Sequence, residues 1–277
     1  FMKNTHKMTD RPNQENVILP LSLTKEEKEQ FADFCKNQEQ TMSGRIKQLM
    51  RKDMGMTALS PYKEKYQKDI IDVVLGNSRS IIVKSRQMFV STLLLSIVLH
   101  QALDKKRKNV LFISCNSQSR KRHMQQFSLQ CEENSVGIER KSSFGMELDN
   151  GVHVSFQDGI GTGFEGDLVV FDEFAFQEMD EETMRSVMTA TNDVVVSSTP
   201  FRGSLFNKLA IEAVNGQNEF KLHVAHWSMN SLYQQKGLVA VPVEGKDGVS
   251  FTVRPCGMME RLRDEDTYLQ EMECRLF

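Results

Sequence analysis

The chain has 277 residues, 39% hydrophobic and 26% charged, so it can bury a sizeable core in one large or two modest domains. Its formal net charge of -2 excludes a uniformly basic nucleic-acid-binding protein, and any contact with DNA would come from local patches. The five cysteines are far apart and form no Cys-x-x-Cys or Cys/His cluster, so we expect reduced thiols and no zinc site. No apolar run approaches the ~20 residues of a membrane span and no signal peptide is visible, so we expect an intracellular, soluble protein with no membrane partner.

Near the N-terminus, residues 16–54 predict a strand followed by two helices. Apolar and polar side chains alternate in residues 16–23, as in a strand with one buried face. Thr24 and Glu27 form a predicted capping box before the first helix, and the second helix is expected at residues 43–54. This order resembles the ribbon-helix-helix family, whose paired strands read DNA bases. The outward strand positions carry no Arg or Lys to read guanine, so base reading and a dimerisation or docking role both stay open.

Upstream of the central motif, residues 58–75 predict a connector that leads into a helix. Tyr62 and Gln67 precede most of its apolar positions. In motor ATPases a glutamine and an aromatic residue just before the phosphate loop often hold the adenine. A solvent-facing helix start explains the same two residues equally well, so both interpretations are kept.

A basic loop follows a short buried strand at residues 80–83. Residues 84–92 read KSRQMFVST and lead into an apolar run at residues 93–99, long enough for a buried helix. This is the layout of a phosphate-binding loop, in which backbone N–H groups hold anionic oxygens, a lysine neutralises phosphates and a hydroxyl ligates Mg²⁺. The usual pattern has Gly-Lys before the hydroxyl pair, whereas Phe89 and Val90 stand there. An ordinary strand-loop-helix connection is therefore the alternative on spacing alone.

The middle of the chain predicts a second buried strand, a helix and a hairpin. The strand is expected at residues 109–114 and the hairpin at residues 146–156. The helix, residues 117–127, carries three consecutive basic residues from Arg120 onwards. We interpret that run as a solvated helix face, with contact to DNA or to a neighbouring subunit as the alternatives.

Two adjacent carboxylates end the apolar strand expected at residues 167–173, DLVVFDE. Asp172 would hold a Mg²⁺ ion with its water shell, and Glu173 would orient and deprotonate an attacking water. A strand that ends in two acids by chance is the alternative, and it weakens when the acids are taken together with the upstream loop.

A further buried strand is expected from residue 193 and ends in three hydroxyl residues. Such side chains can sense a γ-phosphate and pass its loss to a moving element, or they can simply cap a turn. Strands that end in polar residues predict an α/β fold, namely a P-loop NTPase with a mainly parallel central sheet flanked by helices. The predicted coupling residues are Ser197, Ser198 and Thr199.

Four motifs stand in an order that is typical of one family. They are KSRQM from Lys84, NG from Asn150, VVFDE from Val169 and STP from Ser198. Together they resemble the large terminase subunit of tailed bacteriophages, the ATP-driven motor that packages DNA into the procapsid. The resemblance covers about residues 58–277, whose closing segment is similar to the end of the family's ATPase region.

The resemblance implies ATP and Mg²⁺ as cofactors and gives roles to the loop residues. Lys84 would neutralise the phosphates from the first position of the loop, with Val90 at the vacated place. Ser91 and Asp172 would hold the metal, and Arg86 would be a cis arginine finger on the γ-phosphate. The implied catalytic residues are Glu173, Arg86 and Lys84. The implied nucleotide contacts are Lys84, Ser85, Arg86, Gln87, Met88, Phe89, Val90, Ser91, Thr92, Tyr62 and Gln67.

Three features depart from the family pattern. Phe89 stands where relatives commonly have glycine, and its side chain would narrow the pocket or change the loop. Residues 161–167 lack an arginine that relatives often carry, for which Arg202, Arg120 or a neighbouring subunit are the alternatives. A nuclease domain follows the ATPase in the family; we expect it downstream, absent from this chain.

These observations predict an ATPase that translocates double-stranded DNA into a procapsid, in the host cytoplasm at the portal and not in the mature virion. The expected partners are the portal protein, the small terminase subunit and further copies of the chain in a ring. The expected domains are a ribbon-helix-helix-like module at residues 1–55, an ATPase core at 56–221 and a lid or linker at 222–277. The alternatives are another P-loop nucleic-acid motor such as a helicase, or a DNA-binding or assembly protein with a degenerate P-loop domain.

Overall fold

The computed structural model describes residues 24–37, 58–104, 107–159, 166–191, 193–231, 240–245, 248–253 and 274–276. The chain divides into two compact units, residues 1–49 and 50–277, each taken by itself. The described part of the first unit is Thr24 with helix α1 (Lys25–Asn37). The Thr24 N–H donates to the Glu27 carboxylate at 2.7 Å and the Glu27 N–H donates to the Thr24 hydroxyl at 3.2 Å, which confirms the predicted capping box. The strand predicted at residues 16–23 and the helix at 43–54 lie outside the described residues.

The second unit is built on an eight-stranded sheet in the order β3-β4-β5-β2-β6-β7-β1-β8. All strands from β5 to β8 in this order pair in parallel, whereas β3 and β4 are antiparallel at one end. This confirms the predicted α/β fold class with a mainly parallel sheet. The strands are β1 (Arg79–Lys84), β2 (Asn109–Ile113), β3 (Ile138–Lys141), β4 (Gly145–Leu148), β5 (His153–Gln157), β6 (Leu168–Asp172), β7 (Asp193–Ser198) and β8 (Lys221–Ala225).

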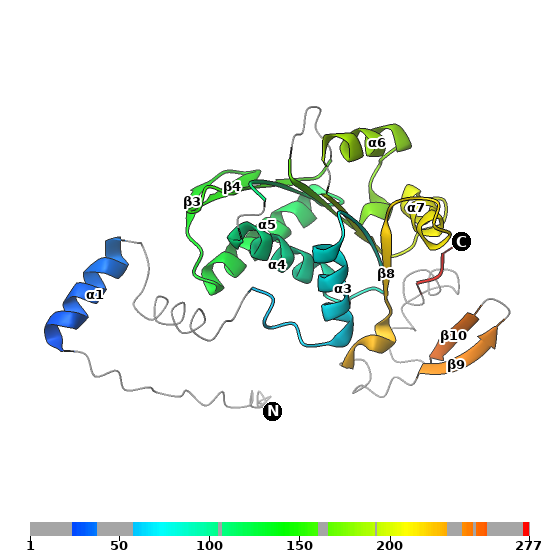
Figure 1. Cartoon of the computed structure of the whole chain (residues 1–277), viewed down its shortest axis with the longest axis horizontal. Coiled ribbons are helices and arrows are strands. Elements are labelled where there is room, and N and C mark those ends of the chain that lie inside the picture. The colour runs from blue at the N-terminus through cyan, green and yellow to red at the C-terminus, as the bar shows by residue number, and fades with distance from the viewer. Residues whose placement is uncertain are drawn as a thin grey trace, which may run out of the picture. The chain divides into compact units, whose positions relative to one another are not determined.

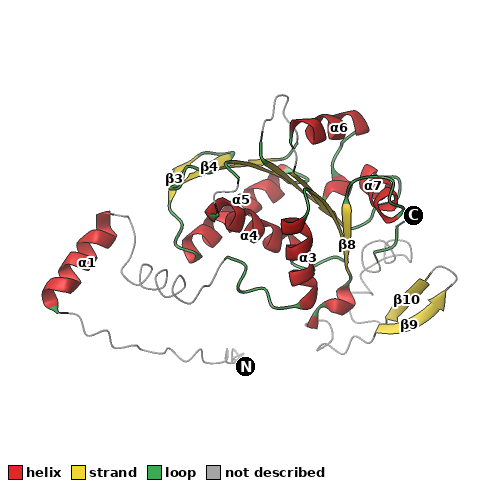
Figure 2. Cartoon of the chain, viewed as in Figure 1, coloured by secondary structure: helices red, strands yellow, loops and turns green. Residues whose placement is uncertain are grey.

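Helices cover both faces of this sheet. Helices α3 (Lys65–Gly76), α4 (Val90–Leu103) and α5 (Ser117–Glu133) lie on one face, and α6 (Glu181–Ala190) and α7 (Leu205–Val214) lie on the other (Figures 1 and 2). None of the described helices is long and apolar enough to cross a membrane. The short helices η1 (Phe174–Phe176) and η2 (Trp227–Met229) follow β6 and β8, and β9 (Ala240–Gly245) pairs with β10 (Gly248–Val253).

Each buried strand sends alternate side chains into two separate cores, as a two-faced sheet requires. In β1, Ile82 joins the core beneath α4, and its neighbours Ile81 and Val83 join the core beneath α6 and α7. Every large side chain buried in this way contributes about 1.5–3 kcal/mol. The sheet is thereby fixed in register, and with it the edge at which the strands end.

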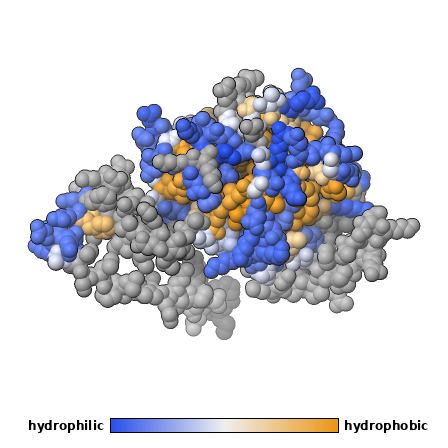
Figure 3. All heavy atoms as spheres, in the orientation of Figure 1, coloured by the Kyte–Doolittle hydropathy of each residue, from blue (hydrophilic) through white to orange (hydrophobic). Residues whose placement is uncertain are grey.

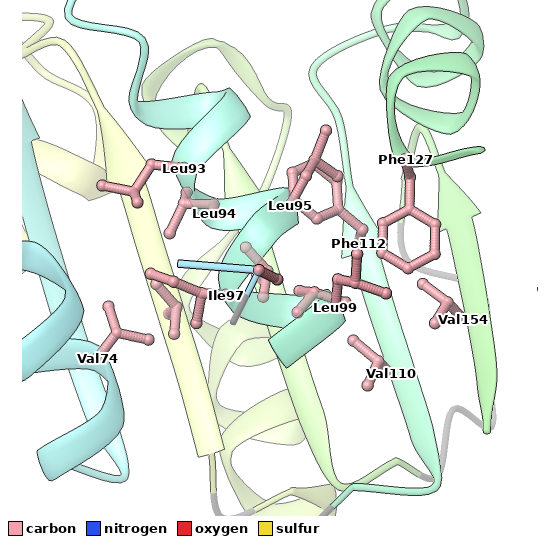
Figure 4. Packing of buried hydrophobic residues seen from close by; sticks show 14 of the residues in the cluster. Val74, Leu93, Leu94, Leu95, Ile97, Leu99, Val110, Phe112, Phe127 and Val154 are labelled. Carbon is pink, nitrogen blue, oxygen red and sulfur yellow. The ribbon is translucent and has the colours of Figure 1, made fainter. Parts of the chain in front are cut away.

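Helix α4 is buried on almost every side, which explains its unbroken apolar sequence. Its Ile97 and Leu99 lie between Val74 of α3 and Phe112 of β2 (Figure 4). Apolar residues gather near the centre of the face seen in Figure 3, with hydrophilic residues around them. The first residues of α4 are therefore anchored rigidly below the loop that precedes them.

The first strand of the region predicted as a lid or linker, residues 222–277, pairs with the core sheet. Strand β8 pairs in parallel with β1, so the strand at the predicted start of the lid belongs to the core sheet. The Cys274 thiol lies 3.3 Å from the Ser85 hydroxyl, so the last described residues also contact the loop after β1. Strands β9 and β10 pair antiparallel. Strand β3 has no sequence signal, because its side chains are mostly exposed and do not alternate.

Candidate nucleotide-binding site

The carboxyl ends of β1, β6 and β7 meet at one edge of the sheet, as expected for the site of a parallel α/β fold. The strand register sets Asp172 opposite Ser197, and Val83 opposite Ser198. Lys84, which ends β1, therefore lies beside the hydroxyl residues of β7. Strand β7 lies between β1 and β6, the strand that ends in the acids. Three segments that are far apart in the sequence are brought to one place by the sheet alone.

Lys84 and Glu173 form an ion pair at this edge. The Lys84 side chain is buried, with 5% of the residue exposed. Burial alone would lower the pKa of its ammonium, but Glu173 and Asp172 outweigh burial and raise that pKa above the ordinary value. The Ser198 hydroxyl donates to the second Glu173 oxygen at 3.4 Å and accepts the N–H of Ala175 at 3.2 Å. Glu173 is thus linked to the ends of both β1 and β7.

Asp172 is 1% exposed and combines two features that suit a cation ligand. Its Oδ1 atom is buried with no hydrogen-bond partner among the described residues. Burial raises the pKa of its carboxyl to about 6, with Lys84 opposing and Glu173 adding to the shift, and Ser91 lies close enough to lower that pKa. A buried carboxylate oxygen beside a serine hydroxyl is the hard-oxygen donor set that Mg²⁺ prefers. The residues present therefore fit a Mg²⁺ ion.

The loop after β1 has an unusual backbone for its sequence. Gln87 (φ 61) and Phe89 (φ 56) are left-handed, as is Glu173 (φ 57) after β6. For a residue with a side chain this conformation costs roughly 1–2 kcal/mol, so strain is concentrated at the site. Phe89 keeps the backbone that glycine would favour, and the residue is 57% exposed. The departure at Phe89 is accommodated by exposure of the ring together with backbone strain.

The same loop is anchored by segments that are remote in sequence. The Ser85 hydroxyl accepts the N–H of Trp227 at 2.9 Å and also contacts Cys274. The Met88 carbonyl accepts the hydroxyl of the buried Tyr66 at 3.1 Å. Helix α3, the segment after β8 and the C-terminal residues thus hold the loop from three sides.

The two residues predicted to hold adenine lie close to the loop but have other partners. The Tyr62 hydroxyl is 2.7 Å from the Ser96 hydroxyl of α4. Gln67 accepts the N–H of Glu64 at 3.2 Å and donates to the Tyr66 hydroxyl at 3.3 Å. Tyr66 therefore makes the direct contact with the loop, through the Met88 carbonyl. Gln67 contacts the Tyr66 hydroxyl.

The remaining predicted site residues fall into two groups. Arg86 and Gln87 are exposed on the loop. The Thr92 hydroxyl accepts the side-chain N–H of Gln126 on α5 at 2.7 Å. The buried residues of the predicted set, beyond those already described, are Val90, Ser197 and Thr199.

Arg120 corrects the prediction of a solvated basic face on α5. It is buried, its Nη1 donates to the Ser143 carbonyl at 2.6 Å, and its Nε lies 3.5 Å from Asp158. Its guanidinium also stacks on Phe144, 4.2 Å from the ring centre. These contacts hold the turn between β3 and β4, so Arg120 does not suit the role of the missing arginine, whereas Arg202 is exposed.

His123 is a site residue that the sequence pattern did not indicate. Its Nε2 lies 3.3 Å from Asp172 Oδ2, and its Nδ1 lies 2.8 Å from the Ser114 hydroxyl. Burial, with Arg122, lowers the pKa of its imidazole to about 4, so the ring is neutral near pH 7. Helical spacing is the sequence feature that indicates its burial, because Arg120 and His123 share a face of α5 with the apolar Phe127.

Several solved structures of phage large terminases and their ATPase domains are similar to this chain. A mutant form of the ATPase domain from Thermus phage P74-26 matches with a TM-score of 0.53 and 13% identity, over 78% of this chain and 95% of that one. The large terminase of a thermophilic bacteriophage matches with a TM-score of 0.57 and 10% identity, over 77% of this chain and 53% of that one. The same terminase in complex with ATP-γ-S matches with a TM-score of 0.51 and 11% identity, over 62% of this chain and 48% of that one.

No protein-family model matches the sequence, and no curated protein matches it. The chain spans about half the length of the thermophilic phage terminase, 53%. At identities of 10–13% the likeness establishes the fold. The second unit of this chain therefore has the fold of a phage large terminase ATPase domain.

Proposed function

We propose that this chain is the ATP-hydrolysing motor domain of a phage large terminase, which drives double-stranded DNA into a procapsid. The observation that carries the proposal is the ion pair of Lys84 with Glu173, next to the buried Asp172 at the carboxyl edge of the sheet. A cation and two acids at the end of a P-loop strand are the groups that phosphoryl transfer needs. The likeness to a terminase in complex with ATP-γ-S supports the same ligand.

In this proposal the loop binds the phosphates of ATP. Its backbone N–H groups and the first turn of α4 face the anionic oxygens, and Lys84 supplies the balancing charge. Asp172 and the Ser91 hydroxyl would hold Mg²⁺, which neutralises charge on the β- and γ-phosphates when it is bound. Arg86 is exposed on the loop and would approach the γ-phosphate as a cis arginine finger.

Glu173 would act as the general base. In the structure Lys84 holds its carboxylate. An incoming γ-phosphate competes for the same ammonium, so nucleotide binding would release Glu173 to orient a water molecule and accept its proton. Because Ser198 donates to Glu173, that release also changes a contact at the end of β7. Ser198, with Ser197 and Thr199, would thus couple hydrolysis to movement.

The wider assignments rest on the resemblance to terminases. DNA would be gripped by charge and shape, and the chain would act as a ring at the portal with the portal protein and the small terminase subunit. The host cytoplasm, at the procapsid, is the proposed location. Residues 1–55 would be a ribbon-helix-helix-like docking or DNA-binding module, and residues 222–277 would form a lid or linker.

ATP hydrolysis by the full chain tests the proposal, with Lys84→Ala and Glu173→Gln as the decisive variants. We expect each change to lower turnover by about 10²-fold or more, while Glu173→Gln keeps nucleotide affinity. Glu178→Gln, an exposed acid beyond η1, is the matched control and should behave as the wild type. Turnover that neither decisive variant changes would overturn the site. A chain that binds no nucleotide would instead favour an assembly protein with a degenerate P-loop.

A further inference from the structure

Three buried polar side chains form a line that ends at Asp172, the first residue of the acid pair. Ser114 follows β2, His123 lies on α5 and Asp172 ends β6. The Ser114 hydroxyl is 2.8 Å from His123 Nδ1, and His123 Nε2 is 3.3 Å from Asp172 Oδ2. We infer that His123 is a positioning residue, which fixes the carboxylate of Asp172 so that its other oxygen faces a metal ion. The inference rests on the proposed role of Asp172 as a Mg²⁺ ligand.

The donors and acceptors of this line have a consistent direction. The Ser114 N–H donates to the Gln157 carbonyl at 2.8 Å, which fixes Ser114 at the end of β2. A carboxylate oxygen can only accept, so the neutral ring beside Asp172 carries its proton on Nε2, and Nδ1 then accepts from the Ser114 hydroxyl. Asp172 Oδ2 lies 3.3 Å from Nε2, and Oδ1 has no hydrogen-bond partner among the described residues. One oxygen is held, and the other is left for a cation.

A fixed carboxylate matters because the terminal torsion of an aspartate is broad and has no strong preference of its own. His123 is itself held firmly, since it is 7% exposed and meets Phe112 edge-to-face at 5.1 Å. Partners of this kind behind a metal ligand typically change metal affinity about 10–100-fold when they are removed. His123 therefore has the position and the rigidity that the role requires.

The order Ser-His-Asp also occurs in hydrolytic triads, which makes a nucleophilic Ser114 the obvious rival. A nucleophile must reach its substrate. Ser114 is 1% exposed, and its hydroxyl and N–H both have partners inside the core. We therefore assign the line to the orientation of Asp172 and not to attack by Ser114.

The test is the affinity of the full chain for Mn²⁺, measured by electron paramagnetic resonance with a non-hydrolysable ATP analogue. His123→Leu removes the donor and keeps the bulk, and we expect Mn²⁺ affinity to fall about 10–100-fold. His123→Gln retains an N–H near the position of Nε2, so it should recover most of that loss. His153→Leu, at an exposed position on β5, is the matched control. Thermal unfolding of each variant checks that it is folded.

The variant Asp172→Asn distinguishes a failure of the His123 inference from a failure of the proposed metal site. If Asp172→Asn abolishes Mn²⁺ binding and His123→Leu binds it as the wild type does, the inference about His123 is wrong and the proposed function stands. If Asp172→Asn also binds Mn²⁺ normally, the proposed metal site itself is wrong. Equal losses in His123→Leu and His123→Gln would show that packing and not the donor matters, which would overturn the inference as well.

Discussion

The loop after β1 and the turn after β6 meet at one edge of the sheet, but they are held in different ways. The loop is fixed by residues from segments remote in sequence, with Tyr66 at the Met88 carbonyl and the Trp227 N–H at the Ser85 hydroxyl. The acids of the turn are fixed through their side chains, by Lys84, Ser198 and His123. Substitutions of the residues that contact the acids should therefore change the pH dependence of stability and the rate of hydrolysis. Substitutions of the residues that anchor the loop should change nucleotide affinity and the free energy of unfolding.

Lys84 is the residue that joins the two regions, so its removal should have the largest effect. Lys84→Met leaves two partly or fully buried acids without their cation, which we expect to cost about 3 kcal/mol of unfolding free energy. Urea denaturation of the full chain measures this. Adding Glu173→Gln to Lys84→Met should restore part of the loss. A loss as small as that of Lys68→Ala, at an exposed position on α3, would show that the pair does not hold the regions together.

The pH dependence of stability tests the acid turn by itself. The folded-state pKa of Asp172, about 6, lies above its ordinary value of 3.8, so the folded chain binds the proton more tightly. The stabilisation from that proton is complete below the unfolded pKa and is lost as pH rises through 6, by about 2–3 kcal/mol in total.

In metal-free buffer, the stability of Asp172→Asn relative to the wild type should therefore rise from about pH 4 to about pH 6 and stay level between about pH 7 and about pH 8. Chemical denaturation at several pH values gives this difference, with Asp72→Asn on the exposed face of α3 as control. A difference that stays constant with pH would mean that Asp172 is not desolvated.

Tyr66→Phe tests the anchoring of the loop. The substitution removes one hydroxyl and leaves the Met88 carbonyl without that partner, which should cost about 1–1.5 kcal/mol. Because the loop is then less well held, ATP-γ-S affinity should fall by several-fold with little change in the pH profile. Isothermal titration calorimetry measures the affinity, and unchanged binding and stability would show that the loop is held without Tyr66.

Phe89→Gly should have the smallest effect, and its sign is informative. Glycine removes the left-handed cost of roughly 1–2 kcal/mol but adds about 0.5–1 kcal/mol of chain entropy. Phe89→Ala keeps a side chain, so the free-energy cost of the left-handed backbone conformation remains. We therefore expect Phe89→Gly to be more stable than Phe89→Ala by about 1 kcal/mol in denaturant unfolding. The reverse order would show that Phe89 is not strained.

The parts of the site that depend on strand register could be predicted from the sequence. An apolar strand that ends in a polar residue indicates both a buried strand and the edge where it stops, as at Lys84, Asp172 and Ser198. Strand β8 was assigned to the lid, because its residues are half exposed and do not mark it as a core strand.

The contacts between segments remote in sequence could not be predicted in the same way. The run from Arg120 resembles a solvated face, and only the packing of α5 shows that Arg120 and His123 point inward. The anchors of the loop, Tyr66 and Trp227, come from elements on either side of it, and no local pattern links them to it.

We propose that Lys84, at the first position of the loop, binds the phosphates in place of the usual P-loop lysine. Calorimetry with ATP-γ-S on the full-length wild type, Lys84→Ala and Lys68→Ala measures the contribution of this lysine to nucleotide affinity. We predict that Lys84→Ala binds about 100-fold more weakly, as expected for loss of a charge-assisted contact of up to about 3 kcal/mol, and that Lys68→Ala binds as the wild type. Equal affinity in all three proteins would contradict the claim.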